Sequence, residues 1–161
     1  METFVDNPFA ALTIVVAPAI LTNAATVPSL GTGNRMARVV DRSRALAAEL
    51  VTLASGDSRA GAISTQLGQL RARARLLLLA LRCFYASISA FAAAALVAVV
   101  GTVAEPRMPE LFPVAAGLGL AAGIIGVGGL VIGGILMVRE TQLAVVFLER
   151  ESDVLGISSQ T

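Results

Sequence analysis

Hydrophobic and polar positions alternate in long blocks along this chain. Three blocks are almost entirely apolar, at about 9–30, 83–103 and 112–138. Each is long enough to cross the roughly 30 Å of hydrocarbon in a bilayer as an α-helix, which takes about 20 residues. The pattern therefore predicts an all-α integral membrane protein with three transmembrane helices.

Between the first two blocks, apolar positions recur every three or four residues in two series. The series are Met36, Val39, Ser43, Leu46, Leu50, Leu53 and then Ile63, Leu67, Leu70, Ala74, Leu77, Leu81, Phe84. A polar turn at 55–61 separates them. Two apolar seams joined by a short turn are typical of an antiparallel helical hairpin, predicted here at 34–82. Its second arm should run without a break into the second span.

Glycine and proline mark the expected interruptions. The run Gly31-Thr32-Gly33 is expected to end the first helix, with Thr32 or Asn34 capping the next one. Pro18 and Pro28 lie inside the first block and are expected to kink it, because each lacks a backbone donor. Beyond the third block the helix should continue over 139–153 and pack on the hairpin.

Charge is distributed unevenly. Residues 35–82 contain nine arginines and three acids, a net charge of +6, whereas residues 139–161 contain two arginines and four acids, a net charge of −2. Basic loops stay on the cytoplasmic side. The hairpin and the C-terminus are therefore expected in the cytoplasm of a bacterial cell, with the N-terminus outside and residues 1–161 forming one multi-pass domain of the inner membrane. The first seven residues contain no arginine, so the first block is expected to be a retained span rather than a signal peptide.

Composition removes several classes of chemistry. The chain is 56% hydrophobic and 14% charged, and it contains no histidine, tryptophan or lysine and a single cysteine, Cys83. A single thiol cannot form an intrachain disulfide or hold zinc or an iron–sulfur cluster. No Ser/His/Asp set or intramembrane carboxylate pair is present. We therefore expect no enzyme, no metal site and no cofactor.

Five glycines of the third block share one helical face: Gly119, Gly123, Gly126, Gly129 and Gly133. Small residues let helix backbones approach closely in lipid. Two partners fit this stripe, namely the other spans of the same chain or another subunit. Asn23 is the one strongly polar side chain deep in the first block, and it fits either an interhelical hydrogen bond or the lining of a pathway.

The arginines give the sharpest candidate site. Arg35, Arg38 and Arg42 follow helical spacing, and an antiparallel hairpin brings Arg71, Arg73, Arg75 and Arg82 back alongside them. The residues expected to contact anionic lipid headgroups or a partner are Arg35, Arg38, Arg42, Arg44, Arg71, Arg75 and Arg82. Asp41 is expected to neutralise part of this charge. Positive-inside topology with an internal salt-bridge network also fits the cluster, whereas nucleic-acid binding is not expected, because the arm lacks stacking aromatics.

Three motifs carry a resemblance to a known family. They are Asn7-Pro8-Phe9, Ala17-Pro18-Ala19-Ile20-Leu21, and Asn34-Arg35-Met36-Ala37-Arg38-Val39-Val40-Asp41-Arg42-Ser43-Arg44-Ala45-Leu46. Over about 7–138 the chain resembles the bacterial membrane-protein family known as domain of unknown function 2721. The resemblance implies a membrane protein with no assigned activity and no catalytic residues.

Two functions fit these features. The first is a non-enzymatic structural or accessory subunit of a larger inner-membrane complex, for example a respiratory or photosynthetic one, with partner subunits or copies of itself as neighbours. The alternative is a homo-oligomeric channel for ions or small solutes, in which Pro18, Asn23 and the glycine stripe line or gate the pore.

Overall fold

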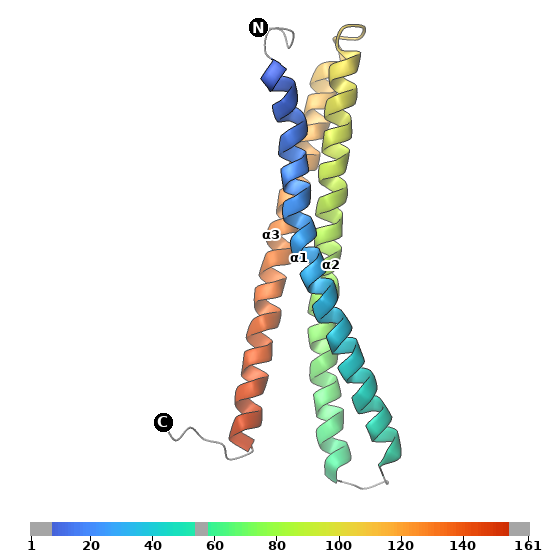
Figure 1. Cartoon of the computed structure of the whole chain (residues 1–161), viewed down its shortest axis with the longest axis vertical. Helices are drawn as coiled ribbons and strands as arrows, with labels where there is room; N and C mark the ends of the chain where they lie inside the picture. The colour runs from blue at the N-terminus through green and yellow to red at the C-terminus, as the bar shows by residue number, and fades with distance from the viewer. Residues whose placement is uncertain (1–7, 54–57, 155–161) are drawn as a thin grey trace. The chain divides into compact units, whose positions relative to one another are not determined.

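Three long helices make up the part of the chain that the computed structural model describes, residues 8–53 and 58–154. They are α1 (Pro8–Thr52), α2 (Ser58–Ala104) and α3 (Leu111–Val154), and no strand occurs among these residues (Figure 1). The all-α prediction is confirmed. The structure also confirms that α2 continues without a break into the second apolar block and that α3 continues beyond Val138. The polar turn is shorter than predicted, since α2 begins at Ser58, and residues 54–57 lie outside the described part.

The helix break predicted at Gly31–Gly33 is wrong, because α1 runs through it and through both prolines. A glycine within a helix costs only about 1 kcal/mol relative to alanine, which tertiary contacts can outweigh. Such a contact exists here. Thr32 is fully buried, and its hydroxyl donates a hydrogen bond to Met137 Sδ at 3.2 Å. Asn34 is therefore an exposed residue in mid-helix and caps nothing.

The chain divides into two compact units, and each helix contributes to both. Unit 1 comprises Met1–Leu30 and Arg82–Gly133, and unit 2 comprises Gly31–Leu81 and Gly134–Thr161. The two units differ in what holds their helices together.

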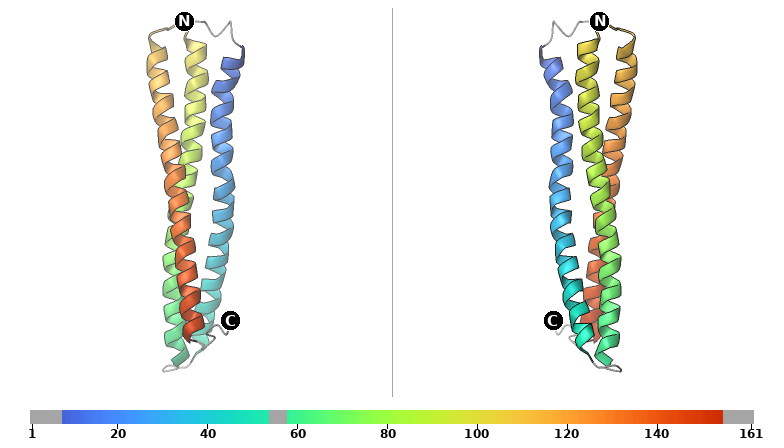
Figure 2. Two further views of the ribbon diagram at one scale, coloured as in Figure 1. Left: turned by 90° about the vertical axis from the view of Figure 1, so that its left-hand side faces the viewer. Right: turned by 90° about the vertical axis from the view of Figure 1, so that its right-hand side faces the viewer.

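In unit 1, α2 and α3 run antiparallel (Figure 2). Aromatic side chains of α2 meet glycines of α3 where the two helices contact each other. Phe84, Ser87 and Phe91 of α2 are fully buried, and they face Gly133, Gly129 and Gly126 of α3, respectively. A β-carbon added at Gly126 or Gly133 would lie 2.5 Å from a ring carbon of the facing phenylalanine, and one added at Gly129 would lie 2.5 Å from Ser87 Oγ. These glycines therefore provide the space into which α2 packs.

The other two members of the predicted stripe make little contact. A β-carbon at Gly119 would lie 3.9 Å from the Ala94 carbonyl oxygen, an ordinary van der Waals distance, and one at Gly123 would meet nothing within 4 Å. Within this unit, the part of the stripe from Gly126 to Gly133 packs on its own chain.

In unit 2, the end of α1 packs against the start of α2 through leucine-rich seams. Leu46 of α1 and Ile63 and Leu67 of α2 form a buried cluster, on which Leu50, Leu53 and Leu70 pack. Every residue of the two apolar series predicted from the sequence is buried or half-buried. The 3.5-residue period therefore identifies the contact faces of both helices.

Two stretches are long and apolar enough to cross a membrane, Arg59–Ala104 and Leu111–Val145. Only 22% and 17%, respectively, of their most apolar windows are buried. A core helix of a soluble protein would be mostly buried, whereas these expose large side chains such as Leu96, Val103 and Leu120. The first predicted span, 9–30, begins among residues 8–15, whose side chains lie outside the described part.

The seam makes a direct prediction about glycine size. Gly126→Ala should lower the free energy of unfolding, because the new methyl group overlaps the fully buried ring of Phe91. Overpacking lowers the free energy of unfolding by about 1–3 kcal/mol. The better helix propensity of alanine offsets at most about 1 kcal/mol of this loss. The matched control is Gly128→Ala, where a β-carbon meets nothing within 4 Å. Thermal unfolding in detergent, followed by circular dichroism, should show a lower Tm only for Gly126→Ala. Equal Tm values would contradict close packing at this seam.

Candidate functional site

A carboxylate buried within a bundle of helices forms the centre of the candidate site. Glu140 lies on α3 and is only 1% exposed. Removing a charge from water is costly unless nearby groups pair with it and donate hydrogen bonds. The burial of Glu140 therefore requires cationic partners from the neighbouring helices.

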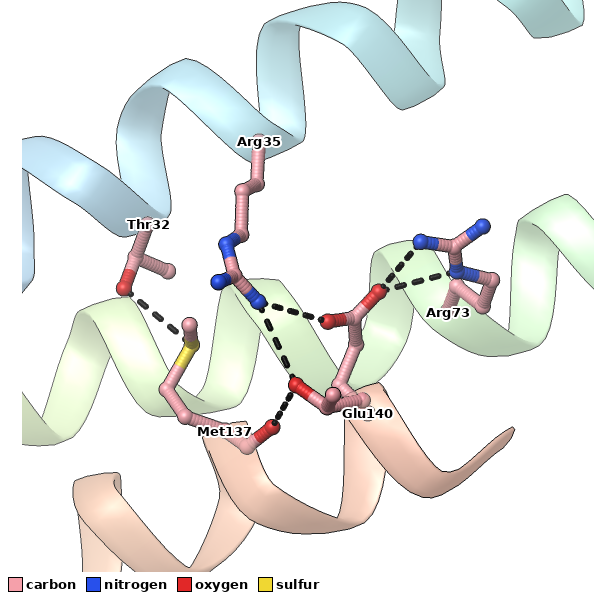
Figure 3. Close-up of polar contacts among 6 residues, drawn as sticks. Thr32, Arg35, Arg73, Met137 and Glu140 are labelled. Carbon is pink, nitrogen blue, oxygen red and sulfur yellow. Dashed lines mark hydrogen bonds and ion pairs between the residues drawn. The ribbon is translucent and has the colours of Figure 1, made fainter. Parts of the chain in front are cut away.

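Arginines from the two other helices supply these partners, as Figure 3 shows. Arg73 of α2 places Nε 2.8 Å and Nη2 2.7 Å from Glu140 Oε1. Arg35 of α1 places Nη1 3.4 Å from Oε2. Each carboxylate oxygen thus has its own arginine, and one acidic residue connects all three helices of unit 2.

Threonine and methionine side chains extend this network along α1 and α3. Arg35 Nη1 also donates to Thr141 Oγ1 at 3.3 Å, and that hydroxyl donates to the Met137 carbonyl oxygen at 3.0 Å. One helical turn before Arg35, Thr32 donates to Met137 Sδ (Figure 3). The contacts Thr32–Met137 and Arg35–Glu140 each join residues 105 positions apart, so α1 and α3 run parallel here.

Beside the buried carboxylate lies a pocket of about 440 Å³, which we call the arginine pocket. Its lining residues are Arg35, Arg38, Val39, Arg42, Leu70 and Arg73. Arg38 and Arg42 are exposed and make no hydrogen bond or ion pair with the described residues. The pocket therefore contains guanidinium donors that no group of the described chain neutralises.

The structure brings together only part of the predicted arginine set. Four of its members are exposed, lie outside the pocket lining and form no ion pair with a described residue: Arg44, Arg71, Arg75 and Arg82. Asp41 is exposed and also forms no such pair. Asn23 is exposed as well, and it forms no hydrogen bond within the described part of the chain.

Two central residues were not among the predicted site residues. The predicted contact residues omit Arg73, which the sequence places in the returning arm, and Glu140, which is one of the four acids of 139–161. The sequence does carry a signal for Glu140. Extending the glycine stripe beyond Gly133 at the same spacing reaches Leu136 and then Glu140, and all three residues are buried. An acid at a buried position of such a series predicts a basic partner on a facing helix.

The arrangement presents positive charge and planar hydrogen-bond donors from Arg35 and Arg73. The single carboxylate is already engaged by two guanidinium groups. Among the described residues, no group of three or more His, Cys, Asp and Glu side chains is placed to hold a metal ion.

The Glu140 network predicts a specific loss of stability. Glu140→Gln should lower the free energy of unfolding by about 1–3 kcal/mol, because two arginines lose their counter-charge. This expected loss of stability is smaller than the loss for a fully buried ion pair, since the side chains of Arg35 and Arg73 are 44% and 30% exposed.

The matched control is Glu49→Gln. Glu49 also pairs with an arginine, Arg59, at 3.1 Å, but the side chains are 39% and 70% exposed, so the loss should be below about 1 kcal/mol. Chemical or thermal unfolding in detergent compares the two variants. Equal losses would show that burial of Glu140 contributes nothing.

Comparison with known proteins supports the resemblance seen in the motifs. Residues 15–150 match the family described as "Protein of unknown function (DUF2721)", a range that contains Glu140 and the whole arginine pocket. No curated protein and no solved structure matches this chain. The family match covers well over half of the 161 residues, and the chain therefore belongs to the DUF2721 family of proteins of unknown function.

Proposed function

We propose that this chain is a non-enzymatic accessory subunit of a larger bacterial inner-membrane complex. In this proposal it crosses the membrane three times, at about 9–30, 83–103 and 112–138. The N-terminus lies outside, and the basic segment 34–82 and the end of α3 lie in the cytoplasm. The arginine surface of unit 2 binds neighbouring subunits or anionic headgroups.

One observation carries the proposal, namely the division of chemistry between the units. Unit 1 exposes large apolar side chains and joins α2 to α3 through glycines and phenylalanines. Unit 2 contains the arginine pocket and the Glu140 ion pairs. An exposed apolar surface suits lipid, and unpaired arginines suit an anionic partner at the aqueous surface. This combination supports anchoring and docking.

No specific observation favours the channel alternative. Cavities of about 310 and 600 Å³ in unit 1 both have Pro18 and Gly119 in their walls. Apart from Thr102, however, their lining is apolar, and Asn23 lines neither of them. A path for ions through lipid needs polar groups that replace water, so these walls support lipid or helix contact instead.

Purification from the native membrane tests the proposed role. Gentle detergent extraction followed by native mass spectrometry should release this chain together with other polypeptides at a fixed stoichiometry. A second preparation that carries Glu140→Gln should lose those partners if they bind to unit 2. A homo-oligomer without other subunits, together with ion conductance after reconstitution in liposomes, would contradict the proposal.

Cysteine labelling tests the proposed orientation. In a Cys83→Ala background, Met108→Cys should react in intact cells with a membrane-impermeant maleimide, because Met108 is exposed between α2 and α3. Ser64→Cys, at an exposed position in the basic segment, should react only after the cells are opened. The reverse labelling would overturn the assigned orientation, and labelling of both in intact cells would overturn the membrane topology.

A further inference from the structure

The arginine pocket has the size and lining of a binding site for a small anion. Its volume of about 440 Å³ lies within the range of roughly 300–1,000 Å³ that is usual for small-molecule sites. Arg35, Arg38 and Arg42 approach it from α1, and Arg73 approaches it from α2. Val39, which is 6% exposed, and the half-buried Leu70 supply an apolar part of the wall. Guanidinium groups from two helices therefore converge on one space.

The charge around this space is not balanced by the described chain. The pocket is lined by four arginines, and among the residues that the structure describes the one carboxylate that pairs with any of them is Glu140, which leaves a net charge of +3. Arg38 and Arg42 are four residues apart on one helix, a spacing at which like charges repel. An anion bound between them would remove this repulsion, so the site gains stability by being occupied.

The Glu140 network also holds two of the donors in place before any ligand arrives. Arg73 uses Nε and Nη2 on Glu140, which leaves Nη1 without a partner among the described residues. Arg35 uses Nη1 on Glu140 and Thr141, which leaves Nε and Nη2. A guanidinium that is already oriented loses less conformational entropy when it binds an anion.

We propose that the arginine pocket binds a phosphate-bearing anion, namely a phosphate monoester or a diphosphate. A phosphate monoester carries a charge of about −1.5 to −2 and three strong acceptor oxygens. Planar guanidinium groups match the geometry of phosphate oxygens and bind them through paired hydrogen bonds. The ligand comes either from a lipid headgroup or from a soluble phosphorylated compound, and both sources present the same chemistry to the pocket.

Binding of inorganic pyrophosphate to the purified full-length chain tests this proposal. The protein is placed in nanodiscs of phosphatidylcholine alone, and titration calorimetry measures the Kd. Pyrophosphate should bind, and its affinity should fall steeply as salt concentration rises. Arg38→Gln and Arg42→Gln should each weaken binding about tenfold or more, the scale of one lost charge-assisted hydrogen bond.

The matched control is Arg44→Gln, on the same helix but outside the pocket lining, and it should change the Kd less than about twofold. Arg42→Lys should retain part of the affinity, since the charge remains and only the planar donor is lost. Circular dichroism shows whether each variant is folded, and pyrophosphate should raise the Tm of the parent protein more than that of Arg38→Gln. An Arg44→Gln loss as large as that of Arg42→Gln, absence of binding, or equal binding of citrate would overturn the proposal.

A second titration separates the two sources. The same protein is placed in nanodiscs of an equal mixture of phosphatidylcholine and phosphatidic acid. If a lipid headgroup is the ligand, it already occupies the pocket and pyrophosphate binding disappears. If the ligand is soluble, pyrophosphate binding persists.

The inference deepens the proposed function by naming a ligand class. It is tested on the isolated chain, so failure to find partner subunits leaves it standing, and absence of pyrophosphate binding does not remove the accessory role.

Discussion

Burial of the Glu140 carboxylate is the constraint on which unit 2 depends. A charge removed from water must recover its lost hydration from the protein, and here the two carboxylate oxygens take their donors from different helices. Arg35 and Arg73 consequently have fixed directions, and so do the turns of α1 and α2 that carry them. The leucine cluster of Leu46, Ile63 and Leu67 adds apolar burial, but apolar contacts alone tolerate several rotational settings. The ion pairs distinguish among those settings.

Unit 1 solves the same packing problem with shape instead of charge. Lipid chains are as apolar as leucine, so helices surrounded by lipid gain little from hiding apolar surface, and close contact between them has to supply the attraction. Phe84 and Phe91 project over glycines that leave room for their rings, and Ser87 satisfies its hydroxyl on the Cys83 carbonyl oxygen of its own helix. The seam thus contains no polar group that requires a partner from another helix.

Periodicity was a reliable guide to the helices, because each face is set by residues a few positions apart. The two apolar series and the glycines from Gly126 to Gly133 could be read in this way. The break at Gly31–Gly33 was predicted wrongly, since local glycine propensity carries no information about the contact of Thr32 with α3. The pairing of Glu140 was also out of reach. Sequence spacing favoured Asp41 as the acidic partner, because it lies three residues from Arg38. The carboxylate that pairs with Arg35 and Arg73 is instead Glu140, which is more than sixty residues from each of them.

The paired contacts between α1 and α3 restrict how unit 2 can move. Thr32 meets Met137 and Arg35 meets Glu140, so two points one turn apart are fixed on parallel helices. Packed helices can change state by sliding past one another, in the most drastic cases by one turn, about 5.4 Å. Such a shift would leave Glu140 buried without its partner from α1. Rotation of α1 about its own axis by the angle between successive residues, about 100°, would likewise carry Arg35 away from Glu140. The two contacts therefore fix the register of this segment of α1 against α3, whereas the side chains of Arg38 and Arg42 take no part in that register.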